Sequence, residues 1–432
     1  MKVPSLLLFV TLMASAVGGS AGEVEVMHPW GSTTEGRSLA ELKTALAERG
    51  HTWKDAAVPD DNGLKAAAIA RERVRAGSPP GAAVIRGTAL AEMAELKAFA
   101  NLDTMANFER WYSFLPQVVQ DQIKHKGHYV AAPVSIRRTN WLWINQEVLR
   151  LASVSTVPAS IDDLLKAAER VRAAGFVPLA HGGQPWEDLL LFENVVLGVG
   201  GVDFYNKAFV QLDAGALMAA DMRRSLEVFR QLRGLADGGS QGPTTAIAAA
   251  DLLAKGKAAF LIGSDSAKAR LLAAGRVAGR DFTCTPMPGT AGAFSYVVDT
   301  LAMFQLKSWE AQKAQGYLAY LAVGKKFQEE FNLREGGLPA RHDVAVDKFD
   351  DCAKAAKRAF TSADQSGKLV PSVALDMAVP SGVQAALQKV VSDYASNERM
   401  LAQDAMAALV NAVTPSATSE GKKDGDRRQR RP

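Results

Sequence analysis

A serine motif and two later residues could form a hydrolytic triad. Residues 238–242 read Gly-Gly-Ser-Gln-Gly and match the Gly-x-Ser-x-Gly pattern around a nucleophilic serine, here Ser240. Asp299 and His342 follow in the order that an α/β-hydrolase requires. That motif needs a strand directly before the serine, because the strand must turn sharply into a helix. Residues 225–239 instead form an amphipathic helical pattern that ends in glycines, which disfavours a serine hydrolase.

Two carboxylic acids suggest a second enzymatic interpretation. Glu35 and Asp299 could serve as the acid pair of a glycosidase if about 5–10 Å separated them across a cleft. Their separation cannot be taken from the sequence, so this alternative stays open at this point. The six histidines and two cysteines show no metal-ligand spacing, and the chain has neither a P-loop nor a dinucleotide fingerprint. We therefore expect no metal and no cofactor.

Two tryptophans stand beside polar residues in loops, a combination suited to sugars. Trp30 lies in a polar loop that follows an expected strand, and Trp186 lies near Gln184 and two acids. A sugar offers an apolar face to an indole ring and hydroxyl groups to amides and carboxylates. Each tryptophan could equally be a core or hinge aromatic. Asp299 interrupts an apolar run, which favours either a ligand acceptor or the cap of a following turn.

Two arginines at the ends of expected strands could hold an anion. They are Arg86 and Arg137. A guanidinium presents a fixed fork of hydrogen-bond donors, which suits a carboxylate or a sulfate. The alternative is ordinary ion pairing with acids of the protein itself. The sequence alone leaves both interpretations of the two arginines open.

The chain alternates short strands with helices, which is the pattern of an α/β protein. In such sheets, ligands bind beyond the carboxyl ends of the strands, so the loops after the strands are where a site is expected. The periodicity of apolar residues predicts strands at 24–28, 82–85, 177–180 and 258–262, and helices at 62–76, 160–173 and 244–255.

Length and charge limit the class of protein. The chain has 432 residues, of which 48% are hydrophobic and 22% charged, a composition typical of two or three packed domains. Its net charge is +4, but residues 23–414 contain 43 basic and 43 acidic side chains. The excess of basic residues lies in 415–432, which we expect to be a disordered, solvated tail. An electroneutral body disfavours nucleic-acid binding.

The N-terminus has the features of a secretory signal. Lys2 precedes an apolar run at 5–17, and small residues at Ala21 and Gly22 offer a cleavage site near residue 22. The alternative is a buried N-terminal helix. The run is too short to act as a membrane anchor, and no cysteine follows it to accept a lipid. Export would permit a disulfide between the two cysteines, which could otherwise be buried free thiols.

Eight long segments resemble the extracellular sugar-binding proteins of ABC importers (solute-binding protein family 1), and among them the glucose- and mannose-binding type. The resemblance covers residues 24–413. It implies an α/β, two-lobed periplasmic binding protein fold of type II, with doubly wound sheets joined by a hinge that the chain crosses several times. The segments that carry it are 24–35, 127–145, 178–205, 256–263, 284–304, 331–344, 348–355 and 369–380.

The resemblance also implies a mode of action. The two lobes would close on one sugar, and the closed form would dock on an ABC permease in the inner membrane, without chemistry on the ligand. A monomer in the periplasm fits this action, and signalling to a membrane chemosensor is the alternative. The implied division is a signal peptide at 1–22, a first lobe at 23–133 and 285–335, a second lobe at 134–284 and 336–414, and a tail at 415–432.

The family's binding residues carry over only in part. Trp30 matches the second of two tandem tryptophans in the family's first loop, Glu35 its glutamate and Asp299 its aspartate. Cys284 and Cys352 match a cysteine pair that the family joins as a disulfide. The expected substrate-binding residues are Trp30, Ser32, Glu35, Arg86, Arg137, Gln184, Trp186, Asp265, Lys268 and Asp299.

Departures from the family pattern bear on the identity of the ligand. Arg86 stands where the family has a lysine, Arg137 where it has a histidine, and Ser266 where it has a tryptophan. Further departures are Pro29, Val84, Val297 and Leu375. Guanidinium groups gained in this way suggest a larger or anionic sugar, such as a uronate, a sulfo-sugar or a glycoside with an acidic aglycone. The alternative is a neutral sugar in a widened pocket, with both arginines paired to protein acids.

Overall fold

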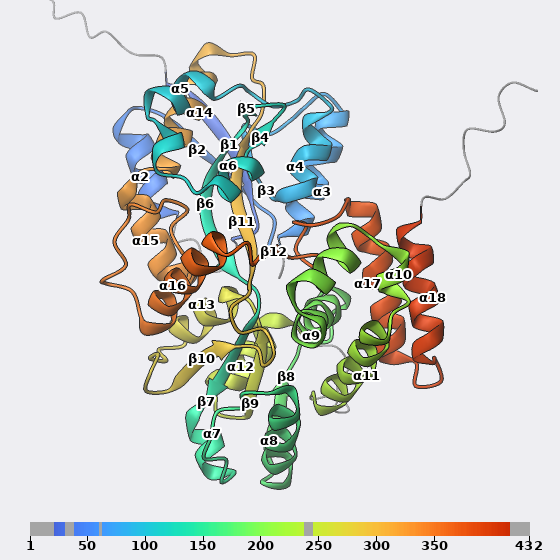
Figure 1. Ribbon diagram of the computed structural model, residues 1–432. Coiled ribbons are helices and arrows are strands. Elements are labelled where there is room, and N and C mark those ends of the chain that lie inside the picture. Colours follow the sequence, from blue (N-terminus) through green and yellow to red (C-terminus); the bar gives the residue numbers. More distant parts are fainter. Residues whose placement is uncertain (1–20, 31–38, 60–62, 237–244, 415–432) are drawn as a thin grey trace, which may run out of the picture.

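The larger of two main sheets carries the N-terminal strand. We describe a computed structural model of residues 21–30, 39–59, 63–236 and 245–414 (Figure 1). In this sheet β11 lies between β3 and β6, and it runs antiparallel to both. The six strands are β1 (Glu23–His28), β2 (Thr52–Ala57), β3 (Ala82–Ile85), β6 (Ala131–Arg138), β11 (Phe294–Met303) and β12 (Leu369–Pro371).

The second sheet has four strands in the order β10-β7-β9-β8. Only β8 and β9 run parallel in it. Its strands are β7 (Trp141–Asn145), β8 (Val177–Ala180), β9 (Ala258–Gly263) and β10 (Phe282–Pro286), and a separate hairpin pairs β4 (Lys124–His125) with β5 (His128–Tyr129).

Helices cover both sheets, which gives the α/β two-lobed arrangement that the sequence predicts (Figure 1). The helices are α2 (Ala40–Glu48), α3 (Leu64–Arg75), α4 (Gly87–Ala94), α5 (Asp103–Phe108), η1 (Trp111–Ser113), α6 (Gln117–Gln122), α7 (Gln146–Leu151), α8 (Ile161–Ala173), α9 (Pro185–Tyr205), η2 (Asn206–Val210), α10 (Ala214–Leu217), α11 (Ala220–Leu235), α12 (Ala246–Ala254), α13 (Asp265–Ala273), α14 (Trp309–Ala322), α15 (Lys325–Glu335), α16 (Asp351–Gln365), α17 (Ser381–Ser396) and α18 (Ala402–Val413). On the larger sheet, α3 packs against β1 and β3, while α14 packs against β1, β6 and β11.

Local sequence explains why these elements form. The alternating residues of β1 place Val24 and Val26 in the core, and Leu42 and Leu46 do the same for α2. Ser160 caps α8 with a capping box, so that helix begins where the sequence predicts. The expected strands at 24–28, 82–85, 177–180 and 258–262 are confirmed as β1, β3, β8 and β9.

Within the described residues, two connections carry the chain directly from one main sheet to the other. The first crossing, residues 139–140, joins β6 to β7, and the second, residues 287–293, joins β10 to β11. Side chains tie these two together: the Thr139 hydroxyl donates to that of Ser295 over 2.6 Å, and the Asn140 amide donates to the Thr290 hydroxyl over 2.9 Å. These bonds between adjacent crossings hold the hinge strands in register with each other.

The segment that follows β12 leads to α17 and is held by a buried acid. Glu193 of α9 is 1% exposed, and its carboxylate accepts from the Ser372 hydroxyl at 2.6 Å. It also accepts from the backbone N–H groups of Val373 and Ala374, at 2.6 and 2.9 Å. Burial raises the pKa of Glu193 to about 7, even though these donors favour its ionised form.

Glu193→Gln should change the pH dependence of stability in a defined direction. The pKa of about 7 in the folded protein exceeds the ordinary glutamate value of about 4.3, so the folded state takes up the proton more readily. The stabilisation from Glu193 is therefore full below about pH 4 and declines as pH rises through about 7. Glutamine does not titrate, so the variant lacks this pH-dependent contribution. From about pH 4 to about pH 8, the free energy of unfolding of the variant should therefore rise by about 3 kcal/mol relative to that of the wild type.

Urea unfolding of both proteins between about pH 4 and about pH 8 measures this difference. Burial lowers the pKa of His181 to about 3, so this histidine titrates in the opposite sense. Its contribution is common to both proteins and cancels in the comparison. A difference that stays constant with pH would contradict the shifted pKa of Glu193.

Candidate ligand-binding site

A cavity of about 150 Å³ lies at the carboxyl ends of strands from both sheets. Trp30 follows β1 and Arg86 follows β3, and both line the cavity from the six-stranded sheet. His181 follows β8 and Ser264 follows β9, and both line it from the four-stranded sheet. The ends of parallel strands are the usual ligand position in α/β sheets, so this cavity is the candidate site.

At the edge of the cavity, Asp299 joins two arginines. It lies on β11, so the flanking strands carry Arg86 and Arg137 to either side of it. The Nε of Arg86 donates to one oxygen of Asp299 and the Nε of Arg137 to the other, each at 2.5 Å. Both arginines line the cavity. Arg86 and Arg137 are therefore both paired, and the same carboxylate, that of Asp299, accepts from each of them.

Burial and charge together set the ionisation of this group. Asp299 is 0% exposed, and burial alone would raise its pKa, but the two guanidinium groups hold the pKa at about 2. Burial would lower the pKa of Arg137, yet Asp299 and Glu335 raise it above its ordinary value. Arg137 also donates to the backbone carbonyl of Glu335 at 3.2 Å. Asp299 and Arg137 are therefore both charged at neutral pH.

The two tryptophans of the expected site reach the cavity from different sheets. Trp30 is 5% exposed; it stacks on His28 with ring centroids 5.6 Å apart, and its ring meets Phe331 at 5.2 Å. Trp186 lies in the first turn of α9, which follows β8 of the four-stranded sheet, and it also lines the cavity. The structure thus brings together two indoles that are 156 positions apart in the sequence.

Gln184 has a structural role at the start of α9. It forms a capping box with Glu187, whose carboxylate accepts from the backbone N–H groups of Gly182 and Gln184 at 3.0 and 3.2 Å. A carboxylate is favourable at a helix N-terminus because unpaired N–H groups meet there. Glu187 lines the cavity, but Gln184 does not belong to its lining.

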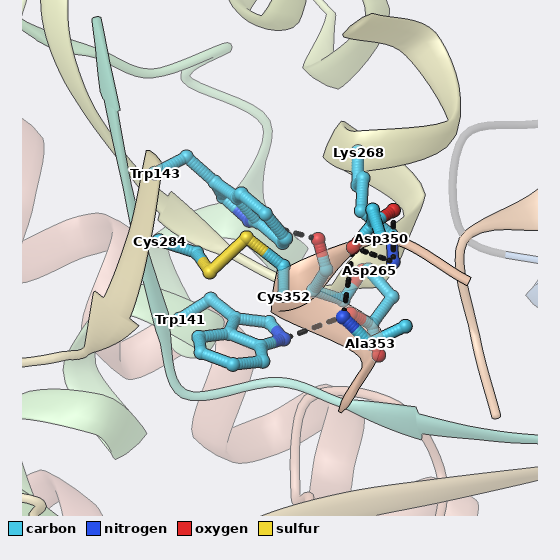
Figure 2. Close-up of a disulfide and its surroundings, with 9 residues drawn as sticks. Trp141, Trp143, Asp265, Lys268, Cys284, Asp350, Cys352 and Ala353 are labelled. Atoms are coloured by element: carbon cyan, nitrogen blue, oxygen red, sulfur yellow. Dashed lines mark hydrogen bonds and ion pairs between the residues drawn. A yellow bond between two sulfur atoms is a disulfide. The ribbon is translucent and has the colours of Figure 1, made fainter. Parts of the chain in front are cut away.

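Asp265 and Lys268 lie near the disulfide (Figure 2), and neither is among the residues that line the cavity. The carboxylate of Asp265 accepts from the backbone N–H of Arg138 at 2.7 Å and from the Trp141 indole at 2.8 Å. Lys268 is 1% exposed and pairs with Asp350 at 3.2 Å. Both side chains therefore use internal partners.

A disulfide joins Cys284 of β10 to Cys352 of α16 (Figure 2). It closes a sequence separation of 68 residues. Asp350 lies just before Cys352 and caps α16 by accepting from the backbone N–H of Ala353 at 2.8 Å. The cap, the Lys268–Asp350 pair and the disulfide together fix the start of α16 against α13 and the four-stranded sheet.

Three residues of the sequence analysis, Ser32, Glu35 and Ser240, lie outside the described residues. The hydrolase interpretation needs Asp299 to orient a histidine, but both oxygens of Asp299 accept from arginines. Within the described ranges, no cluster of histidine, cysteine and acidic side chains could hold a metal ion.

Part of the cavity wall was not identified from the sequence. It comes from α12 and α13, which contribute mostly alanines. Alanines at 246, 249 and 250 lie on one helical face, and that spacing was the available signal. Alanines on one helical face are also typical of a helix packed in a core. The sequence therefore could not tell whether these alanines line a cavity or contact another helix.

Comparison with known proteins identifies the family. The family model described as "Bacterial extracellular solute-binding protein" matches residues 30–323. The chain belongs to this family. As a solute-binding protein it is a binding protein and not an enzyme, which confirms the expectation from the sequence. Among the helices that the structure describes, none is both long and apolar enough to cross a bilayer.

Relatives of this solute-binding protein match along nearly their whole length. A probable sugar-binding periplasmic protein of Brucella melitensis is 38% identical over 390 residues, which cover 90% of this chain and 91% of the relative. A protein of the same name from Rhizobium meliloti is 35% identical, with coverage of 93% and 96%. The solved structure of a chitin oligosaccharide binding protein aligns with a TM-score of 0.78 at 17% identity, covering 91% of this chain and 98% of that one. This likeness confirms the two-lobed type II fold.

Proposed function

We propose that this solute-binding protein captures a sugar in the periplasm and delivers it to the permease of an ABC importer. The relatives with 38% and 35% identity are named as probable sugar-binding periplasmic proteins, which supports a sugar ligand. The observation that carries the proposal is the meeting of Trp30 and Trp186 in one cavity. Because the two indoles come from different sheets, closure of the lobes brings both onto the same ligand.

The proposed ligand is a neutral sugar. Asp299 accepts from Arg86 and Arg137, and the nearby acid Glu335 also acts electrostatically on Arg137. The two cations thus have two acids of the protein close to them. An anionic ligand would have to compete with these acids for the same guanidinium groups, and a buried charge without a partner is costly. This arrangement matches the neutral-sugar alternative of the sequence analysis.

In the proposed site, hydroxyl groups of the sugar accept from the guanidinium N–H groups that face the cavity. The apolar face of the ring rests on Trp30 or Trp186, since C–H groups pack well on an indole. Asp299 acts through the arginines by holding both forks in place. Export to the periplasm rests on the expected signal in residues 1–22, which lie largely outside the described residues.

Trp30→Ala and Trp186→Ala should each weaken sugar binding by about tenfold, because each removes one aromatic contact with the ligand. The control is Trp309→Ala on α14, since Trp309 is 65% exposed and is not among the residues that line the cavity. Thermal shift with a panel of neutral sugars and the matching uronates identifies the ligand, and calorimetric titration then gives the affinities. Equal losses in all three variants would contradict the proposed site.

The same panel tests the charge of the ligand. A neutral sugar should bind at least about tenfold more tightly than the uronate of the same stereochemistry, because the uronate brings an uncompensated charge into the cavity. A uronate that bound more tightly than its neutral counterpart would contradict the pairing argument and restore the anionic alternative. If no sugar of either kind bound, the proposed function itself would be wrong.

A further inference from the structure

The side of the cavity that α12 and α13 line, called the groove here, is mainly apolar. Small apolar side chains line it on both sides: Ala246, Ala249 and Ala250 from α12, and Ala267, Ala269 and Ala273 from α13. The two helices pack against each other and together form this side of the cavity. It is a continuous part of the cavity that contains the candidate sugar site.

The groove begins where the polar part of the site ends. The Arg137 guanidinium donates to the Ser266 hydroxyl at 3.3 Å, and Ser266 lines the cavity at the first turn of α13. Serine is a small side chain, so it leaves room in the cavity beside the alanines of α13.

The groove offers mainly apolar contact. Ile247 lines it and is 44% exposed, although a side chain of this size is usually buried. The charged residue of α13 on this wall, Arg270, pairs with Asp251 of α12 through two bonds of 2.7 and 3.1 Å. That ion pair ties the two helices together. A ligand group in the groove would therefore contact the methyl groups of the alanines, next to the Arg270 guanidinium that already pairs with Asp251.

We propose that this groove binds an apolar aglycone, so that the ligand is a neutral glycoside and not a free monosaccharide. The inference rests on the proposed sugar-binding function and adds the class of ligand. The sugar ring occupies the space between the tryptophans and the arginines, and its substituent at the anomeric carbon enters the groove past Ser266. Burial of that substituent against alanine and isoleucine side chains supplies affinity through the hydrophobic effect.

The test compares phenyl and methyl glycosides of the same sugars, each in both anomers, by calorimetric titration of the purified protein. We expect one phenyl glycoside to bind about tenfold more tightly than its methyl counterpart, which corresponds to about 1.4 kcal/mol. Ala246→Leu should remove this advantage by filling the groove, while leaving methyl glycoside affinity within about twofold, a difference well under 1 kcal/mol.

Ala248→Leu is the matched control, because Ala248 lies on α12 without lining the cavity. It should keep the preference for the phenyl glycoside. Thermal unfolding of each variant verifies that it is folded, and the comparison of the two glycosides on the wild-type protein stands without any variant. If methyl and phenyl glycosides bind the wild type equally well, the groove inference is overturned and the sugar-binding function stands. If free sugars and both kinds of glycoside fail to bind, the proposed function fails with it.

Discussion

Asp299→Asn should lower the free energy of unfolding by about 3–5 kcal/mol at neutral pH, the cost of breaking a buried ion pair by removing one partner. Asp299 is fully buried, and it is the acid that bonds directly to both Arg86 and Arg137. Asparagine cannot neutralise either cation, and its amide nitrogen would face one of the guanidinium groups. Arg137, which is 5% exposed, would then keep its charge in a buried position without its nearest acid.

Equilibrium unfolding in urea at neutral pH measures this loss, and Asp343→Asn is the control. Asp343 also pairs with two cations, Arg341 and Lys325, but it is 31% exposed, so its removal should cost at most about 1 kcal/mol. If Asp299→Asn and Asp343→Asn lowered the free energy of unfolding by the same amount, burial would not be what makes the Asp299 ion pairs important for stability.

The pH dependence of the Asp299 effect has a definite sign. Its pKa of about 2 lies below the ordinary aspartate value of about 3.9, so its stabilisation is full above about pH 4 and disappears as pH falls through 2. The gap between wild type and Asp299→Asn should therefore narrow in acid. A gap that stayed the same down to about pH 2 would contradict this assignment.

Removal of the Cys284–Cys352 disulfide should cost about 4 kcal/mol of stability. The bond closes a loop with a sequence separation of 68 residues, and the loss of chain entropy in the unfolded state accounts for most of this value. Unfolding of the wild type with and without a thiol reductant measures the effect, in parallel with the Cys284→Ser/Cys352→Ser double variant. The reductant should lower the stability of the wild type to that of the double variant.

The reductant should leave the double variant unchanged, since that protein has no other cysteines to reduce. Sugar affinity should change little in both cases, because the disulfide lies among residues that do not line the cavity. A wild type that is equally stable in reductant would mean that the Asp350 cap and the Lys268–Asp350 pair already hold α16 in place.

Local patterns predicted the elements of the fold well. The strands at 82–85 and 258–262 are short apolar runs bounded by turn residues, and each appears as predicted. The sequence could not decide whether Arg86 and Arg137 bind an anionic ligand or pair with acids of the protein. It depends on β11 pairing with both β3 and β6, and residues more than 160 positions apart meet only through that pairing.

Helix phase explains why another part of the site could not be predicted. Asp265 and Ser266 are neighbours in the chain, but one side chain faces the hinge and the other the cavity. Ser264 caps α13 and thereby sets which residues of its first turn face each side. The sequence marks this segment as a loop followed by a helix, yet it does not specify the rotation of that helix against the sheet.

The division of α13 into two faces has an evolutionary consequence. Asp265 and Lys268 maintain the architecture, through Trp141 and Asp350, while Ser266, Ala269 and Ala273 line the groove. Mutations at Ala269 and Ala273 change the shape offered to a ligand without touching the contacts that Asp265 and Lys268 make. Descendants of this protein could therefore exchange one cargo for another in few steps, while mutations at Asp265 or Lys268 would be removed by selection for folding.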